Sequence, residues 1–454
     1  MPQAPRHARR TRFRRMRLLP LMAATFFMVS GGPYGIEDII GGAGYAWAFV
    51  LLLSLPLLWS LPTALMIGEL ASALPAEGGF YIWVRRALGP FWGFQEAWLS
   101  LAASIFDMAI YPTLFTLYLG RLAPTFTAGH RAVWWSLAVL AACLLWNLLG
   151  AASVGSGSVW LMCLLMAPFA ILVVGGMRQG SAAAASSSSH SLDFATAFLV
   201  ALWNYMGWDN ASTIAAEVEQ PQRNYPRAMI GAAVLVTVCY VVPTLAARAA
   251  GLSPATFSTG SWADAARMLV GPWLGLAIVA GGMINGFGMC NALMLSYTRL
   301  PVALAQDGFL PRIFARHNRA GAPWVAIVLC AVGWGFAVNL TFERLISIDL
   351  VLYGGSLILE FVALAVLRWR EPELIRPFRI AAGTTACVLL GIPPTILIGA
   401  ALVMARGEHI AKVPALGLAS AIAVLGPVAY AIQAWSRNRQ AALTEARETG
   451  EITG

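Results

Sequence analysis

The stretch Ser30-Gly31-Gly32-Pro33-Tyr34-Gly35 interrupts an apolar run that begins at Leu18 and continues to residue 45. A helix that starts at Leu18 has advanced by about 18 Å when it reaches Ser30. Because the hydrocarbon core of a bilayer is about 30 Å thick, this interruption lies too deep for a surface loop. Unwound backbone at that depth is tolerated only where it is buried in protein or lines a cavity. The stretch therefore predicts a membrane helix that is broken near its middle.

A second interruption, Asn204-Tyr205-Met206-Gly207-Trp208-Asp209-Asn210, follows an apolar run that begins at Phe194. A packing kink would explain either break alone, but five apolar spans separate one break from the other. Each break thus opens a group of five helices, and an odd number of helices inverts the second group relative to the first. Broken helices at corresponding positions of inverted repeats indicate the midplane substrate site of a transporter.

The composition of the 454-residue chain is that of a polytopic membrane protein. Hydrophobic residues make up 59% and charged residues 11%, whereas roughly 25% of the residues in soluble domains are charged. This composition excludes a cytosolic enzyme, a secreted disulfide scaffold and a disordered chain. Apolar segments fall near 18–45, 46–73, 90–119, 132–150, 157–177, 194–216, 227–250, 272–300, 323–341, 348–368, 383–404 and 414–435. The predicted fold is all-α and integral to the membrane, with twelve transmembrane helices.

These segments predict a five-plus-five inverted repeat, with discontinuous helices one and six, followed by two C-terminal helices. The predicted parts are a basic cytoplasmic tail (1–17), a first repeat (18–177), an external linker (178–193), a second repeat (194–370), helices eleven and twelve (371–435) and a polar, disordered cytoplasmic tail (436–454). If the N-terminus is cytoplasmic, most of the 30 Lys and Arg residues lie on the inside, as the positive-inside rule requires. We therefore expect both termini in the cytoplasm and the protein in the cell membrane. The net charge of +9 reflects this topology rather than nucleic-acid binding.

Other classes of site find no support in the sequence. The six cysteines all lie inside apolar runs, which indicates neither disulfides nor a metal site. No H-E-x-x-H motif, nucleophile elbow or phosphate loop is present. We expect a protein that is not an enzyme and that needs no cofactor.

The ionisable residues inside the spans are nearly all acidic, and such residues are costly and usually functional. Asp209, inside the second break, is the strongest candidate for binding substrate. Glu37 and Asp38 begin the outer half of the first helix, where an acid also stabilises a helix N-terminus. Glu96 and Asp107 are eleven residues apart, about three turns, so both lie on one face of the third helix.

An acid-lined cavity without a fixed cation favours a cationic ligand, because the charge of the ligand offsets the desolvation of the carboxylates. A carboxylate left without a cation takes up a proton instead, which couples substrate binding to protonation. The candidates for carrying the coupling proton are Asp209, Glu96 and Glu37.

Three further acids receive structural predictions. Glu69 and Glu360 lie near the cytoplasmic ends of their helices, where salt bridges to loop arginines are expected, and Asp349 is predicted to be solvated at the external end of helix ten. Aromatic residues flank the breaks, and Tyr34, Trp203 and Trp208 could cover a cation and its methylene chain.

Several motifs resemble those of the amino acid–polyamine–organocation transporter superfamily. The segment Gly68–Tyr81 looks like the signature of the second helix, the loop Arg299–Pro323 looks like the basic loop after helix eight, and Glu217-Val218-Glu219-Gln220-Pro221 resembles the motif that closes helix six. Closer still, four segments resemble the polyamine uptake branch known best from plants: SGGPYGIED at 30–38, ALGPFWGFQE at 87–96, DMAIYP at 107–112 and WNYMGWDNASTIAAEVE at 203–219. The members of that branch are proton-coupled importers of putrescine, spermidine and related cations.

The resemblance implies a substrate site between helices one, three, six, eight and ten. Carried over by position, the substrate-binding residues are Asp209, Trp208, Trp203 and Asn204 of helix six, Asp107 of helix three, and Gly31, Gly32, Tyr34, Glu37 and Asp38 of helix one. In one respect the chain departs from the wider superfamily, whose amino-acid carriers hold the substrate carboxylate on a Gly-small-Gly turn. Here Pro33 occupies the third position and has no N–H to donate.

We therefore expect a proton-coupled symporter that imports polyamines by alternating access, with a small cation, protons and the bilayer as its partners. An amino-acid permease or an amino-acid/polyamine exchanger of the same fold is the first alternative, and affinity for amino acids without net positive charge would favour it. A non-transporting membrane receptor is a remote alternative, which binding without net flux would identify.

Overall fold

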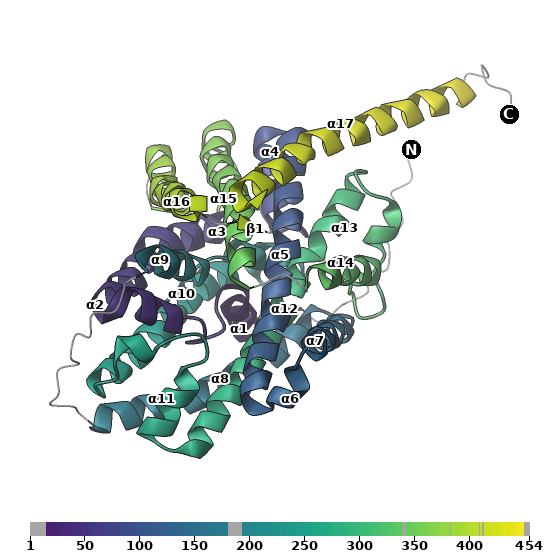
Figure 1. The fold of residues 1–454 in the computed structure, drawn as a ribbon. Coiled ribbons are helices and arrows are strands. Elements are labelled where there is room, and N and C mark those ends of the chain that lie inside the picture. The colour runs from purple at the N-terminus through teal and green to yellow at the C-terminus, as the bar shows by residue number, and fades with distance from the viewer. Residues whose placement is uncertain are drawn as a thin grey trace.

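The computed structural model describes residues 15–179, 193–338, 342–381, 383–407, 409–410 and 413–448. Within these ranges the chain is almost entirely helical (Figure 1). The α-helices are α1 (Leu18–Val29), α2 (Glu37–Leu55), α3 (Leu61–Ala73), α4 (Phe80–Leu88), α5 (Pro90–Leu122), α6 (Pro124–Thr127), α7 (Arg131–Asn147), α8 (Ala151–Gln179), α9 (Phe194–Trp203), α10 (Pro221–Ala249), α11 (Trp262–Leu269), α12 (Pro272–Tyr297), α13 (Arg299–Gln306), α14 (Trp324–Ala337), α15 (Phe342–Arg370), α16 (Thr384–Met404) and α17 (Ala415–Glu448).

Shorter elements complete the order along the chain. A π-helical turn, η1 (Pro56–Ser60), joins α2 to α3. The 3₁₀ turns are η2 (Asp209–Thr213), η3 (Ala215–Glu217), η4 (Pro254–Thr256), η5 (Arg312–Ala315) and η6 (Ala405–Gly407). Two-residue strands, β1 (His409–Ile410) and β2 (Val413–Pro414), pair antiparallel before α17.

Both predicted interruptions are present. α1 ends at Val29 and α2 begins at Glu37, with φ of +83° at Gly32 and +90° at Gly35 between them. α9 ends at Trp203, and after Gly207, with φ of +89°, the chain resumes as 3₁₀ turns rather than as an α-helix. Residues with a Cβ rarely adopt such positive φ, so the glycines allow the helices to unwind at these two points.

The two interruptions lie against each other in the interior. A Cβ added to Gly207 would stand 2.4 Å from the carbonyl oxygen of Met28, at the end of α1. A Cβ added to Gly35 would stand 3.5 Å from Oδ1 of Asn204. The second interruption thus packs on the end of α1, and the first packs on the side chain of Asn204.

Among the described helices, eight are long and apolar enough to cross a membrane: Glu37–Ala73, Pro90–Leu122, Ala151–Arg178, Pro221–Ala249, Pro272–Gln306, Ile348–Arg370, Thr384–Met404 and Ala415–Trp435. Four shorter apolar helices, α1, α7, α9 and α14, accompany them. The run Glu37–Ala73 combines the outer part of the first predicted segment (18–45) with the second (46–73). Gly44, with a non-helical φ of +68°, lies near the predicted boundary between them. Large apolar side chains such as Trp160 and Phe336, 73% and 82% exposed, face outwards as a membrane protein requires.

α5 is the longest helix of the interior and packs along both α12 and α15 (Figure 1). α17 leaves the bundle as a long projecting helix (Figure 1). The prediction that residues 436–454 are disordered is wrong as far as Glu448, because α17 continues to that residue. Its sequence there is rich in Ala, Arg, Gln and Glu, which are strong helix formers. The rest of that tail, residues 1–14 and most of the predicted linker lie outside the described residues.

Candidate substrate site

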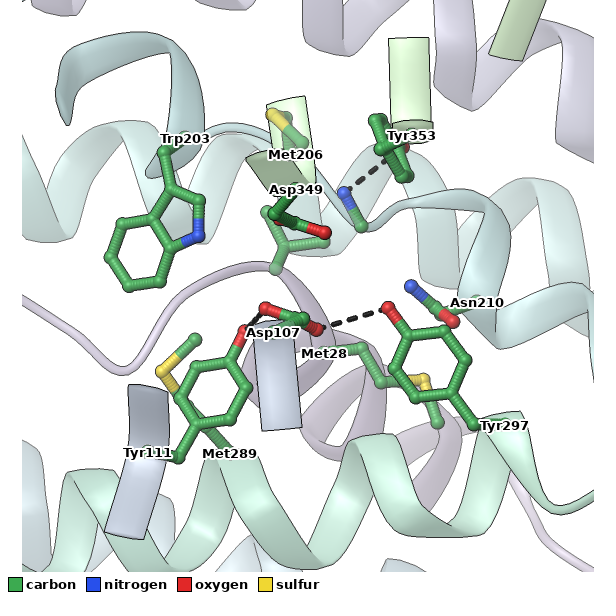
Figure 2. Close-up of a pocket in the computed structure, with 12 residues that line it drawn as sticks. Met28, Asp107, Tyr111, Trp203, Met206, Asn210, Met289, Tyr297, Asp349 and Tyr353 are labelled. Carbon is green, nitrogen blue, oxygen red and sulfur yellow. Dashed lines mark hydrogen bonds between the residues drawn. The ribbon is translucent and has the colours of Figure 1, made fainter. Parts of the chain in front are cut away.

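A small cavity of about 20 Å³ lies where the two interruptions meet α5, α12 and α15. The residues that line it are Met28, Val29, Asp107, Tyr111, Trp203, Met206, Gly207, Asn210, Met289, Tyr297, Asp349 and Tyr353 (Figure 2). No arginine, lysine or histidine is among these lining residues, all of which belong to the described part of the chain. The cavity is therefore walled by carboxylates, aromatic rings and thioethers.

Asp107 of α5 occupies one wall of the cavity, between two tyrosines (Figure 2). Tyr111, one turn along α5, and Tyr297 of α12 both donate their hydroxyl protons to its carboxylate, the latter over 3.0 Å. The ring of Trp203 stacks on that of Tyr111, with centroids 6.2 Å apart and planes inclined by 21°. Asp107 is 4% exposed, so these donors hold a desolvated carboxylate in a fixed orientation.

Asp349 of α15 points into the cavity from the wall opposite Asp107 (Figure 2). The prediction that this residue is solvated is wrong: it is 3% exposed, and its Oδ1 has no hydrogen-bond partner among the described residues. The reason is that α15 begins at Phe342, so residue 349 already lies two turns inside a helix that packs along α5. The carboxylates of Asp349 and Asp107 interact electrostatically across the cavity.

Asp209 lies directly behind the cavity wall, at the first position of η2. The hydroxyl of Tyr353 donates to its Oδ1 and accepts a hydrogen bond of 3.0 Å from the backbone N–H of Gly207. Tyr353 itself lines the cavity, so its side chain separates Asp209 from the empty space. One tyrosine thus joins α15 to the second interruption.

Asp209 belongs to a group of five buried carboxylates that interact electrostatically. The members are Asp209, Asp107, Asp349, Glu96 and Glu360. The prediction of a salt bridge at Glu360 is wrong, since neither of its oxygens has a partner within the described residues. The corresponding prediction for Glu69 is confirmed: Arg368 and Arg376 approach its carboxylate to 2.5 and 3.1 Å.

The predicted acids of the first helix lie outside the cavity lining. Glu37 accepts hydrogen bonds from the backbone N–H groups of Gly35 and Gly260, over 2.6 and 3.1 Å, and from the hydroxyl of Tyr118 over 3.2 Å. Asp38 accepts a hydrogen bond of 2.6 Å from the hydroxyl of Thr259. These contacts tie the outer half of the broken helix to α5 and to the loop between α10 and α11.

Tyr34 also lies outside the lining, since its hydroxyl donates to the carbonyl oxygen of Ile278 over 2.7 Å. Asn204 is buried against α10, where Tyr240 donates to its carbonyl oxygen over 2.8 Å. Trp208 is fully buried, and its Nε1 has no hydrogen-bond partner in the described structure.

Gly31 and Gly32 stand where side chains would not fit. A Cβ on Gly31 would come within 1.2 Å of Oδ1 of Asn285, and one on Gly32 within 2.6 Å of the side chain of Leu165. Their immediate role is to let the first interruption pack against α12 and α8. Of the predicted substrate-binding residues, Asp107 and Trp203 are thus the two that line the cavity, with Asp209 one side chain behind it.

Several lining residues were not predicted from the sequence: Tyr111, Tyr297, Tyr353, Asn210, Asp349 and three methionines. One signal was available. Asp349, Tyr353, Ser356 and Glu360 are spaced by four, three and four residues, which places them on one face of a helix. Within the described ranges, no group of three or more His, Cys, Asp or Glu residues is arranged to hold a metal ion.

Comparisons with known proteins agree with this geometry. The family model described as amino acid permease matches residues 22–418. The chain belongs to the amino acid permease family. It is a membrane transporter with a small organic substrate, not an enzyme.

Curated relatives in this family include named polyamine transporters. Polyamine transporter PUT1 of Oryza sativa subsp. japonica is 34% identical over 91% of this chain and 78% of its own length. Polyamine transporter RMV1 of Arabidopsis thaliana is 34% identical over 85% of this chain and 80% of its own. The predicted resemblance to the plant polyamine branch is thereby confirmed.

A more distant relative and a solved structure complete the comparison. Serine/threonine exchanger SteT of Bacillus subtilis (strain 168) is 26% identical over 82% of this chain and 86% of its own. The crystal structure of MhsT in complex with L-phenylalanine superposes with a TM-score of 0.61, covering 85% of this chain and 98% of that one at 16% identity. The two proteins share a fold.

Proposed function

We propose that the protein is a proton-coupled symporter that imports organic cations, above all polyamines such as putrescine or spermidine. The observation that carries this proposal is the cavity itself, where Asp107 and Asp349 face each other with no basic side chain among the described lining residues. Two buried carboxylates in that position favour a ligand that brings positive charge with it. The names of the plant relatives support the same class of substrate.

Recognition would combine charge with apolar contact. One ammonium group lies between Asp107 and Asp349, and the methylene chain packs on Trp203 and the neighbouring thioethers of Met206 and Met289. A cation over an aromatic face gains about 0.5–2 kcal/mol, and flexible methionines adapt to chains of different length. Asp209, held by Tyr353, supplies a further negative charge behind the wall.

The transport cycle that we propose is alternating access about the two interruptions. The five-plus-five inverted repeat, with twelve spans and both termini in the cytoplasm, gives each interruption a rigid neighbour to move against. The protein would act in the cell membrane. A carboxylate among Asp209, Glu96 and Glu37 carries the coupling proton. Glu37 is the least suited of the three, because its carboxylate already accepts three hydrogen bonds.

An amino-acid permease or exchanger is the alternative, supported by the description of the family model and by the name of SteT. It requires free N–H groups at the first interruption to hold a substrate carboxylate. Gly32 N–H donates instead to Oγ of Ser30 over 3.1 Å, Gly35 N–H donates to Glu37 over 2.6 Å, and Pro33 has no N–H. This arrangement favours a substrate without a carboxylate.

The test is uptake of labelled spermidine into proteoliposomes under an inward proton gradient. Wild type should show gradient-dependent uptake that Asp209→Asn reduces severely while the protein elutes as a folded species. Glu373→Gln, at an exposed loop position, is the matched control and should transport like wild type. Uptake of leucine in place of spermidine would support the amino-acid alternative, and binding of spermidine without any flux would support a receptor.

A further inference from the structure

A second pair of carboxylates lies outside the cavity, between the same two helices. Glu96 of α5 and Glu360 of α15 are both 0% exposed, and neither lines the cavity. Each is eleven residues from a cavity aspartate, Asp107 and Asp349 respectively, which is about 16 Å along a helix. Eleven residues are three turns, so both helices present the second carboxylate on the face that carries the first.

A short hydroxyl chain reaches this pair along the contact between α5 and α15. The hydroxyls of Ser100 and Ser356 are 2.9 Å apart, and Ser356 donates to Oε1 of Glu96. The other oxygen of Glu96 and both oxygens of Glu360 have no hydrogen-bond partner within the described residues. Fully buried polar atoms are nearly always hydrogen-bonded, so three orphaned carboxylate oxygens at one place indicate a missing ligand.

The charged groups that face Glu360 are themselves acidic. It interacts electrostatically with Glu96 of α5 and Asp209 of η2. It also interacts electrostatically with the hydroxyl of Tyr353, which lies on α15 as well. Helices α9 and α16 carry no acidic or basic side chain, and α17 has none before residue 436.

The basic side chains on the remaining neighbours are engaged elsewhere. Those that the structure describes form the pairs Arg368–Glu69, Arg85–Asp307, Arg86–Glu371 and Arg121–Asp264, and Arg370 donates to the carbonyl oxygen of Ala87. Within the described residues, Glu96 and Glu360 are therefore two buried acids that no side-chain cation neutralises.

We propose that Glu96 and Glu360 together hold the coupling proton, at a site separate from the substrate cavity. The ligand is a proton rather than an ammonium group, because the cavity does not extend to either residue. The proton binds a carboxylate oxygen of the pair from water on one side of the membrane and leaves the same pair to water on the other side. No other bond is made or broken.

This assignment deepens the proposed symport and rests on it. Repulsion between two buried carboxylates is unfavourable, so the packing of α5 against α15 is most stable when each pair has gained a compensating positive charge. The substrate cation compensates the charge of Asp107 and Asp349, and the proton lowers the charge of the Glu96–Glu360 pair from −2 to −1. Because Asp209 interacts with all four, reorientation requires both ligands, and cation and proton travel together.

The experiment separates exchange from accumulation in proteoliposomes, with the membrane potential clamped at zero. Counterflow of labelled against unlabelled spermidine at equal pH measures exchange, which needs no net proton movement. Accumulation is measured with pH about 5.5 outside and about 7.5 inside, a gradient that supports about 100-fold accumulation for one proton per substrate. Wild type should show both activities.

Glu360→Gln mimics a permanently protonated side chain. We expect it to keep its counterflow within about twofold of wild type, while the ratio of accumulation with and without the gradient falls to about one. Glu96→Gln should behave in the same way. The rate of spermidine uptake by either variant should not change with the external pH. Glu373→Gln again serves as the control and should retain the full gradient response.

Two results would overturn the assignment. One is gradient-driven accumulation in both glutamine variants at the level of wild type, and the other is loss of counterflow in both, which would make the pair structural. Failure of the proposed function itself is distinguishable, because it appears in wild type: spermidine exchange without any response to the gradient would remove proton coupling altogether.

Discussion

Replacing Asp107 by asparagine tests the role of the cavity carboxylates without changing the shape of the side chain. In the structure this carboxylate accepts hydrogen bonds from Tyr111 and Tyr297 and faces Asp349 across the cavity. A hydrogen bond to a charged group contributes about 1.5–3 kcal/mol. Its loss should weaken spermidine binding by about 10- to 150-fold.

The same substitution should not destabilise the protein in the absence of substrate. Asp107→Asn would remove the repulsion between two buried carboxylates. The new amide can donate to Asp349 while its oxygen still accepts from one tyrosine. We therefore expect the melting temperature of the substrate-free protein to stay the same or to rise.

The assay is equilibrium binding of labelled spermidine to purified protein, paired with thermal unfolding of the substrate-free sample. Glu373→Gln is the control for loss of one negative charge at the surface. A change in the dissociation constant of less than about threefold for Asp107→Asn would refute the reasoning. Weaker binding accompanied by a matching fall in melting temperature would refute it as well, since the loss would then be structural.

Three further substitutions test the framework around the site. Glu69→Gln should destabilise the fold by about 3–5 kcal/mol, because it leaves the buried guanidinium of Arg368 short of its carboxylate; thermal unfolding of wild type and variant measures this. Gly31→Ala should weaken spermidine binding, since its Cβ would displace the Asn285 side chain from the first interruption, and a variant that binds normally would contradict the observed packing. The hydrogen bond with the Glu77 carboxylate raises the pKa of His317 above its ordinary value. His317→Gln should therefore cost about 0.2–1 kcal/mol of stability below the ordinary histidine pKa and progressively less as pH rises through the raised one, so unfolding at acid and alkaline pH should show a shrinking difference.

The interruptions of the two helices were predictable because their cause is local. Gly31, Gly32 and Pro33 cannot propagate a stable helix, and Gly207 provides the positive φ at the second break, whatever surrounds them. The candidate acid Asp107 followed from the cost of burying charge in a membrane span. Such properties belong to a residue and its immediate neighbours, so the sequence shows them directly.

Asp349 and Glu360 were mispredicted because their surroundings depend on packing. The sequence does not reveal that α15 begins early enough to carry residue 349 inside the bundle. Nor does it reveal that Arg368 turns to Glu69 and so is not available to Glu360. The hydrogen bond from Tyr297 to Asp107 likewise depends on the packing of α5 against α12, two segments that are far apart in the chain.

The measurement that tests the central claim most directly is competition for the cavity. Purified wild-type protein is loaded with labelled spermidine, and unlabelled putrescine, spermidine, leucine and phenylalanine are titrated against it. Because the cavity offers two carboxylates and no cation among the described residues that line it, we predict displacement by both polyamines and none by either neutral amino acid. Displacement by leucine or phenylalanine, with no effect of putrescine, would contradict the account.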